Sequence, residues 1–339
     1  MGFKRLDAED FVVSADSVQS TAWSTGLPTL TSFYTSSVQA GSTSGNFYLS
    51  IYQDDVVTSA SSATIQFDIT YGNVNGLGSE YYNGAVPSLT PSRTVYGQYR
   101  TLVLEDENTN FSYGTDNNVF TPNDFWALSV ERARYKEKLF PGTFNITLSG
   151  SGGLLELTDN SNDVNVQTFI GSNRVFQIVS GSDGSAITAN SGYAPGSGSY
   201  GLFLPDIGTI LLNPAAISES INLVPNRTAN LTNGTNQATL YTAISGGGAF
   251  QLNAQETITS DYIFVRSRNS EFNYSENPSF ISGSTGEIIY EQFINNPQVY
   301  ITTVGMYNDA NELIAVAKMS KPLLKDFTKE SLVRVKLDF

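Results

Sequence analysis

The sequence predicts an all-β protein made of two β-sandwich-like domains with few short helices. Three observations support this fold class. Charged residues make up only 15% of the 339 residues, against about 25% in an average globular domain. Gly, Tyr and Phe are abundant, with 29, 18 and 20 copies, and no segment sustains a helical period. Finally, short apolar or alternating runs recur between turn residues along the whole chain.

Most of these runs have 5–9 residues and are rich in Val, Ile, Thr, Tyr or Phe, which is the composition of strands. Many strands at short spacing favour sandwiches over alternating strand–helix units. In order, the expected strands are residues 46–52, 63–70, 94–104, 124–135, 144–148, 164–170, 175–180, 201–204, 238–244, 262–266, 299–307, 313–319 and 331–339.

The C-terminal segment gives the clearest pattern. In residues 331–339, Ser331, Val333, Val335, Leu337 and Phe339 alternate with polar or charged residues, which predicts a strand with one wet face. Residues 300–307 and 313–319 flank a turn and predict a hairpin. Pro322 argues against simple continuation of that hairpin as a central strand.

Three segments could form short helices: residues 5–11, Pro214–Ile221 and 286–294. Pro214 suits the first helical position, where its missing N–H has no consequence.

The charge distribution suggests how the domains are organised. Residues 1–140 carry eight basic and fifteen acidic residues, residues 141–257 carry two and seven, and residues 258–339 carry eight and ten. The low-charge middle predicts a domain of residues 141–257 inserted into a domain built from residues 1–140 plus 258–339. Two domains in series explain the composition nearly as well.

Missing residue types exclude much catalytic chemistry. The chain has no Cys and no His, so it has no disulfide, no thiolate nucleophile, no Ser-His-Asp triad and no His or Cys metal site. Paired carboxylates could still hydrolyse glycosides, and the candidates are Asp54 with Asp55, residues 105–107 and Asp124. Adjacent acids at strand ends are usually solvated loop residues, so we expect no enzyme activity and no cofactor.

Several other binding functions are also not expected. Asp159 to Asp163 resembles the start of a calcium loop but lacks its glycine and closing Glu, so a polar turn is favoured and no metal is expected. A net charge of −14 disfavours nucleic acid as a partner. No run approaches the ~18 apolar residues of a membrane span, and the acidic N-terminus does not read as a targeting segment, so no membrane partner is expected.

A protein-binding surface is the most specific site the residues suggest. Residues 131–138 form the densest charge run, and on a strand its four basic side chains would share one face. A solvated strand face is the alternative for this run. The candidate interface residues are Tyr96, Tyr99, Arg132, Arg134, Lys136, Lys138, Arg334 and Lys336.

Several segments toward both ends of the sequence are similar to those of a known family. These segments are MGFKRLDAEDFVVSADSV at 1–18, TVYGQYRTLVL at 94–104, ERARYKEKLFPGTFNITLSG at 131–150, FVRSRNSEFNYSENPSF at 264–280 and YITTVGMYNDANELIAVAKMSKPLLKDFTKESLVRVKLDF at 300–339. They resemble virion structural proteins of T-even-like contractile-tailed phages, notably those infecting cyanobacteria. The likeness covers about two thirds of the chain and leaves out residues 151–257.

The resemblance implies a non-enzymatic baseplate wedge subunit of the type that forms a homodimer. It also implies two β-sandwich domains, one inserted in the other, other baseplate or tail proteins as partners, and location in the virion after synthesis in the host bacterial cytoplasm. Another tail or neck protein, a receptor-binding or adhesin module and a carboxylate-based glycan depolymerase are the alternatives.

Overall fold

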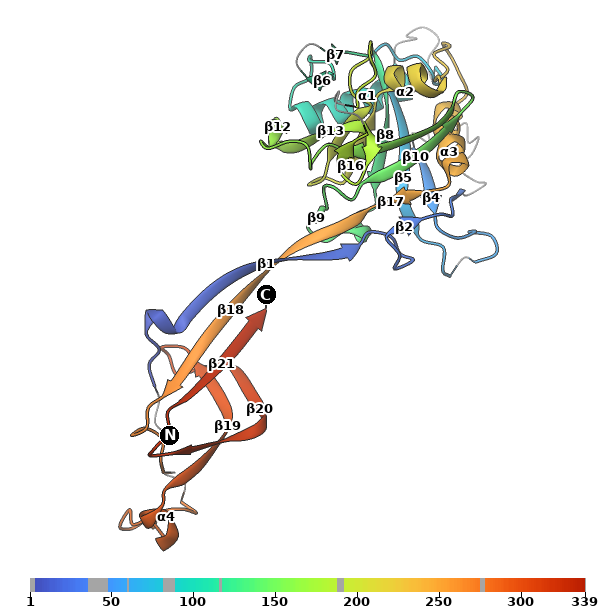
Figure 1. Ribbon diagram of the computed structural model, residues 1–339. Helices are drawn as coiled ribbons and strands as arrows, with labels where there is room; N and C mark the ends of the chain where they lie inside the picture. The colour runs from blue at the N-terminus through green and yellow to red at the C-terminus, as the bar shows by residue number, and fades with distance from the viewer. Residues whose placement is uncertain are drawn as a thin grey trace. The chain divides into compact units, whose positions relative to one another are not determined.

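The chain is mostly β, as predicted. A computed structural model describes residues 4–35, 48–59, 61–81, 89–115, 118–187, 192–274 and 278–338. Strands account for 43% of the residues and helices for 15%, in large curled antiparallel sheets (Figure 1). The all-β prediction is therefore confirmed.

The chain divides into two compact units. Unit 1 comprises Met1–Ser17 and Thr257–Phe339, and unit 2 is the continuous segment Val18–Glu256. One boundary lies next to the expected position at 257/258. The other lies at 17/18 instead of 140/141, because some strands of residues 18–140 pair with strands of the middle segment in one sheet, for example Trp126 with Leu212. Charge composition cannot report such pairing.

Unit 2 is built on one long antiparallel sheet. Its neighbouring strands are, in order, β2 (Thr29–Leu30), β17 (Phe250–Gln251), β10 (Asn145–Gly150), β11 (Gly153–Asp159), β13 (Asn173–Ser182), β15 (Gly201–Leu204), β16 (Thr209–Leu212), β8 (Asp124–Val130), β5 (Ile65–Asn73), β4 (Tyr48–Tyr52) and β3 (Tyr34–Thr35). Two further strands, β12 (Thr168–Ile170) and β14 (Ser185–Ala186), pair with β13 outside this order.

Aromatic side chains close this sheet around a buried core. Phe250 of β17 lies 5.3 Å, between ring centroids, from Phe67 of β5, although the two strands are far apart along the sheet. Phe144 lies 5.9 Å from Phe250 and stacks at 5.4 Å on Phe203 of β15. Trp23 donates its indole N–H to the carbonyl of Phe250 at 2.9 Å. The sheet therefore curls so that its distant strands share one core.

The other face of β5 and β8 is covered by helix α1 (Pro91–Leu104). Residues 94–104 were predicted as a strand, and this prediction is wrong. Thr90 caps the helix by accepting from the N–H of Arg93, and Pro91 occupies its first turn. The buried side chains Val95, Tyr96 and Val103 recur at helical spacing, so their contacts with the sheet outweigh their β propensity.

Residues 238–244, also predicted as a strand, lie in helix α3 (Thr235–Gly247). Glycines with positive φ, Gly234 and Gly248, bound this helix, and it packs on β10. The predicted helix Pro214–Ile221 is confirmed as α2, with Asn213 as its cap.

A polar row crosses the sheet beneath α1. Asp68 of β5 pairs across the strands with Ser50 of β4 and Ser129 of β8. The hydroxyls of Tyr99 and Ser129 lie 2.6 Å apart. One carboxylate oxygen of Asp68, Oδ1, is buried without a hydrogen-bond partner. Burial raises the pKa of Asp68, opposed by a hydrogen bond from Ser50, and the negative charge of Glu131 adds to the rise.

Unit 1 contains the confirmed C-terminal strand, β21 (Ser331–Asp338); Phe339 lies outside the described residues. β21 pairs with β18 (Asn253–Ser267) from Ser260–Asp338 to Ser267–Ser331, and β1 (Phe11–Thr21) lies on the other side of β18. Exposure alternates along β21 as expected, with Val335 buried and Leu332, Arg334 and Lys336 exposed. In place of the predicted helix at 5–11 there is a 3₁₀ turn, η1 (Ala8–Asp10).

The predicted hairpin is also confirmed. β19 (Gln298–Tyr307) pairs with β20 (Leu313–Asp326) as a two-stranded sheet, and helix α4 (Glu291–Asn295) precedes it. β20 continues past Pro322, but its register shifts there, from Ile301–Leu323 to Thr303–Lys318. The proline therefore lies at an irregularity of an edge strand, where a missing N–H is tolerated.

Unit 1 has little hydrophobic core. Both hydrophobic clusters of buried residues lie in unit 2. Among the described hydrophobic residues of unit 1, only Ile263 and Val335 are buried. Lys325 is also buried, and its ammonium donates to the carbonyls of Asn269 and Asp326 and to the side-chain oxygen of Asn273. Strand pairing and this polar anchor hold a unit that buries few apolar groups.

Two helical glycines give a matched test of the packing. A Cβ at Gly247 would lie 1.8 Å from the Thr147 carbonyl oxygen of β10, whereas a Cβ at Gly97 of α1 would meet nothing within 4 Å. We expect Gly247→Ala to destabilise by about 2 kcal/mol or more, because α3 must move off the sheet. Gly97→Ala should stabilise by about 0.5–1 kcal/mol through backbone entropy. Urea unfolding measures both; equal effects would contradict this packing.

The polar row predicts a pH dependence. Because the folded-state pKa of Asp68 is raised, the charged form costs stability above that pKa, and the cost fades as pH falls through it. We expect Asp68→Asn to stabilise by about 1 kcal/mol at pH 7, since it removes the buried negative charge while its amide oxygen can still accept from Ser50. The gain should shrink toward pH 4 in urea unfolding followed across pH.

Asp54 provides the control of opposite sign. The N–H of Asp55 and the hydroxyl of Ser62 lower the pKa of this exposed carboxyl. The carboxylate therefore contributes to folding stability above its ordinary pKa, and this contribution is lost as pH falls through the lowered pKa. Asp54→Asn should therefore destabilise slightly at pH 7 and less at pH 4. The same pH trend in both variants would refute the assignment.

Candidate functional site

The basic run at 131–138 is a compact turn and not a strand. The 3₁₀ helix η2 (Arg132–Arg134) and the short strand β9 (Lys138–Leu139) replace the predicted strand, so the four basic side chains do not share a strand face. A strand would leave Arg132 extended into solvent. Instead its guanidinium donates to the carbonyls of Tyr135 and Lys136 and lies 4.5 Å from the centroid of the Tyr135 ring.

The other basic side chains of this turn differ in their surroundings. Lys136 has a side chain that is 80% exposed and forms an ion pair of 2.9 Å with Glu256. Lys138 lies 3.3 Å from Glu137. The Nε of Arg134 is buried without a hydrogen-bond partner. Lys136 is therefore an exposed cation, whereas Arg132 is engaged in holding the turn.

The two tyrosine candidates belong to the interior side of α1. Tyr96 is buried, packs 5.3 Å from Phe125 and 5.6 Å from Phe111, and its hydroxyl accepts from the N–H of Phe111. Burial raises the pKa of Tyr96, although the Phe111 bond and Arg100 oppose the rise. Tyr99 packs 5.5 Å from Phe125. Within unit 2 these rings stabilise the helix–sheet contact, and Tyr96 presents no exposed surface.

Arg334 and Lys336 lie on the exposed face of β21 in unit 1. Both cations lie over the ring of Tyr262 on the neighbouring strand β18, at 5.6 and 5.8 Å from its centroid. Lys336 also pairs with Asp338 at 2.9 Å, and this hydrogen bond raises the pKa of the lysine. They belong to unit 1, whereas the turn at 131–138 belongs to unit 2.

The candidate carboxylates mostly serve local hydrogen bonding. Asp55 accepts from the N–H of Val57 and the hydroxyl of Thr58. Glu105, at the C-terminus of α1, accepts from the N–H and hydroxyl of Ser172, and the hydroxyl is the larger cause of its lowered pKa. The Thr109 hydroxyl and the Asn108 N–H lower the pKa of Asp106 in the same way. These acids stabilise turns, as the loop interpretation expects.

Asp124 belongs to a hydrogen-bonded cluster that the sequence did not predict, in which Asp124 and Tyr71 are buried and Arg227 is partly exposed. Its carboxylate accepts from the hydroxyl of Tyr71 at 2.8 Å and from Nε and Nη2 of Arg227 at 2.7 and 3.2 Å. Burial, together with the negative charge of Asp124, raises the pKa of Tyr71 far above its ordinary value. The one sequence signal that could have indicated this cluster is that Arg227 is one of only two basic residues in 141–257. The cluster ties the 222–234 loop to the sheet.

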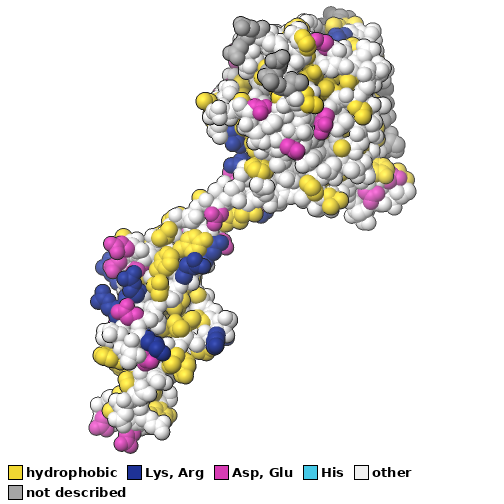
Figure 2. All heavy atoms as spheres, viewed as in Figure 1, with side chains coloured by type: hydrophobic (Ala, Val, Ile, Leu, Met, Phe, Trp, Pro, Cys, Tyr) yellow, Lys and Arg dark blue, Asp and Glu magenta, His cyan; other side chains and the backbone are white. Residues whose placement is uncertain are grey.

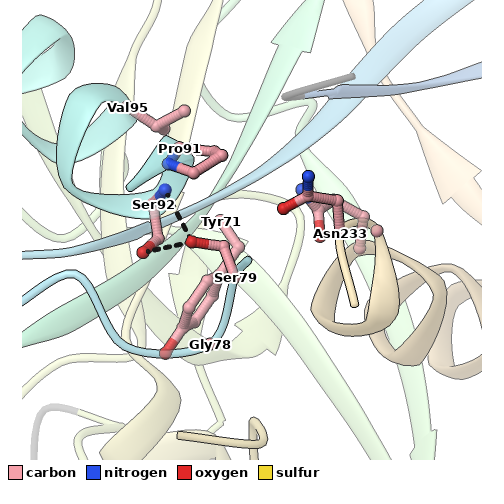
Figure 3. A pocket seen from close by; sticks show the side chains of 9 residues that line it. Tyr71, Gly78, Ser79, Pro91, Ser92, Val95 and Asn233 are labelled. Carbon is pink, nitrogen blue, oxygen red and sulfur yellow. Dashed lines mark hydrogen bonds between the residues drawn. The ribbon is translucent and has the colours of Figure 1, made fainter. Parts of the chain in front are cut away.

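A small cavity lies beside this cluster, at the start of α1. Figure 3 shows Ser79 and Ser92 in contact among its lining residues, with their hydroxyls 2.9 Å apart, and Asn233 apart from this pair. Its volume of about 10 Å³ is at the lower limit for one water molecule. No side chain that could act as a base lines it among the described residues. The Ser79–Ser92 pair caps α1, because Ser79 also accepts from the N–H of Ser92.

A larger cleft opens elsewhere on unit 2, with a volume of about 360 Å³, within the range of small-ligand sites. The described lining contains no carboxylate, so none of the proposed acid pairs lies in it. The lining residues are Phe140, Pro141, Ser161, Val164, Asn165, Gln167, Arg174, Phe176 and Gln255.

The segment from Asp159 to Asp163 forms the expected polar turn. Asp159 is buried and accepts from the N–H groups of Gly142 and Ser161. Burial raises the pKa of Asp159. Among the described residues, no group of three or more Asp, Glu, His or Cys side chains could hold a metal ion. No helix within the described ranges is long and apolar enough to cross a bilayer.

Comparisons with known proteins returned no match. This was the result for models of protein families, for curated protein sequences and for solved structures alike.

Proposed function

We propose that this chain is a non-enzymatic structural subunit of a contractile phage tail, most specifically a baseplate wedge component that assembles with itself and with neighbouring tail proteins. The resemblance of both ends of the sequence to tailed-phage virion proteins suggests this role. One structural observation carries the assembly part of the proposal: unit 1 leaves its large apolar side chains exposed.

The exposed apolar residues of unit 1 lie on several elements, and hydrophobic side chains are visible over this unit in Figure 2. A unit of 100 residues (17 plus 83) with so few buried apolar side chains gains little from its own core. Binding of a partner would bury this surface and stabilise the unit by mass action. The exposed residues include Phe11, Val12, Val13, Tyr300, Tyr307, Leu313, Ile314, Val316, Phe327 and Leu332.

A receptor-binding module is the second candidate, and the cleft of unit 2 favours it. Phe140 and Phe176 offer apolar surface beside the amides of Asn165, Gln167 and Gln255. The one charged residue of the described lining, Arg174, is paired with Asp206 at 2.9 Å, so amides beside aromatic rings suit a neutral polar ligand such as a sugar. Glycan-array binding by the full chain, lost in Gln167→Ala, would favour this candidate over the structural one.

The test of the proposed function is peptide mass mapping of gradient-banded phage particles and of separated tails. We expect this chain in stoichiometric amounts in the tail fraction. Lys136→Glu should reduce its incorporation several-fold, because an exposed cation would become a repulsive charge at a docking surface. Arg132 is a poorer choice for substitution, since it holds the turn together.

Arg93→Glu on the exposed side of α1 is the matched control and should be incorporated normally. Unfolding midpoints of the variants separate loss of assembly from loss of folding. Recovery of the chain only from the soluble lysate would overturn the proposal.

A further inference from the structure

One face of the β18–β21 strand pair in unit 1, named here the arginine face, combines cations with aromatic rings. Directly opposite residues of an antiparallel pair share a face, and so do alternate residues along each strand. The other face of the pair carries the buried Ile263 and Val335. The arginine face is made of three opposite pairs, Tyr262 with Lys336, Phe264 with Arg334 and Arg266 with Leu332.

Two of the three cations on this face have no acidic partner. Lys336 is compensated, because it pairs with Asp338 at 2.9 Å and Asp16 of β1 adds further negative charge nearby. Neither Arg266 nor Arg334 forms an ion pair within the described ranges, although both are exposed. The free positive charge therefore lies at the Leu332 end of the face, away from Asp338.

The spacing of the two arginines defines what can bind both. Arg266 and Arg334 are diagonal neighbours across the strand pair, which places their Cα atoms about 7–8 Å apart. An extended peptide carries the side chains of alternate residues on one side, about 7 Å apart. Arg334 also lies over the ring of Tyr262 at 5.6 Å, a contact that uses its charge and leaves its N–H groups free to donate. Two carboxylates on alternate residues match this arrangement.

Phosphate groups of a nucleic acid would find the same two cations, but two observations favour a protein segment. Unit 1 holds 10 basic and 14 acidic residues, so its net charge of −4 would repel a polyanion. Single-stranded nucleic acids stack their bases on free aromatic rings. The ring of Tyr262 already has Arg334 and Lys336 over it, at 5.6 and 5.8 Å.

We propose that the arginine face is the docking site for an acidic segment of a neighbouring tail protein, bound as an extended chain with two carboxylates on alternate residues. Leu332, which is 57% exposed, offers apolar contact beside the two arginines. Burial of this side chain supplies affinity, and the paired charges select the register. The inference rests on the proposed function and deepens it, because it gives the chemistry of the partner at one surface.

The experiment is fluorescence anisotropy of the full-length chain with a short labelled peptide that carries Glu at alternate positions. We expect saturable binding that weakens with rising salt, because exposed ion pairs are screened. The same peptide with Gln in place of Glu should not bind. Arg266→Gln and Arg334→Gln should each weaken binding about fivefold. Arg93→Gln, on the exposed side of α1 in unit 2, is the matched control and should have no effect.

Arg334→Lys keeps the charge but loses the planar fork, so its affinity should lie between those of the wild type and Arg334→Gln. Circular dichroism checks that each variant is folded. Equal binding of the Glu and Gln peptides, an unchanged affinity in both Gln variants, or tighter binding of a single-stranded oligonucleotide would each overturn the inference and leave the proposed function standing. A chain that binds the Glu peptide as expected but is missing from tails would refute the proposed function alone.

Discussion

The structure of unit 2 depends on one contact, the meeting of Phe250 with Phe67 across the core. β17 and β5 lie seven positions apart along the sheet, so this contact requires the sheet to curl. Trp23 then closes the gap from the N-terminal side by packing 4.9 Å from Phe250 and donating to its carbonyl. Aromatic rings of this size bring large apolar burial and tolerate edge-to-face geometry, which suits a junction between strands that are not hydrogen-bonded.

That closure also explains the position of the helices. Once one face of β5 and β8 is directed at the curled core, their other face needs its own cover, and α1 provides it with Val95, Tyr96 and Val103. The ends of α1 are fixed by polar contacts, Thr90 at the start and Glu105 with Ser172 at the end. The candidate acids of the sequence are therefore largely occupied in holding the fold, which leaves the cleft and the exposed surfaces as places for binding.

The sequence predicted the strands well wherever alternation was strong. β21 and the β19–β20 hairpin follow the printed pattern because their side chains alternate between a wetter and a drier face. The prediction was wrong at α1 and α3, where Thr, Val and Tyr have strand propensity but lie at helical spacing; Thr90-Pro91 and the glycines at 246–248 were the local helix signals. Among site residues, the turn around Arg132 depends on a stacking contact with Tyr135 that spacing does not encode, and the burial of Tyr96 follows from α1 itself.

The division into units changes how the charge of the chain should be understood. Unit 2 holds 8 basic and 18 acidic residues, a net charge of −10, while unit 1 holds 10 basic and 14 acidic residues, a net charge of −4. Unit 1 has less than half the length, so its density of basic residues is about three times higher, and its apolar side chains are exposed beside them. Mixed charge around apolar surface favours association in a defined orientation, because apolar burial supplies affinity and opposite charges select the register. A strongly acidic unit 2 disfavours random contacts between copies through repulsion. The assembly that we propose therefore depends chiefly on unit 1, which leaves its large apolar side chains exposed.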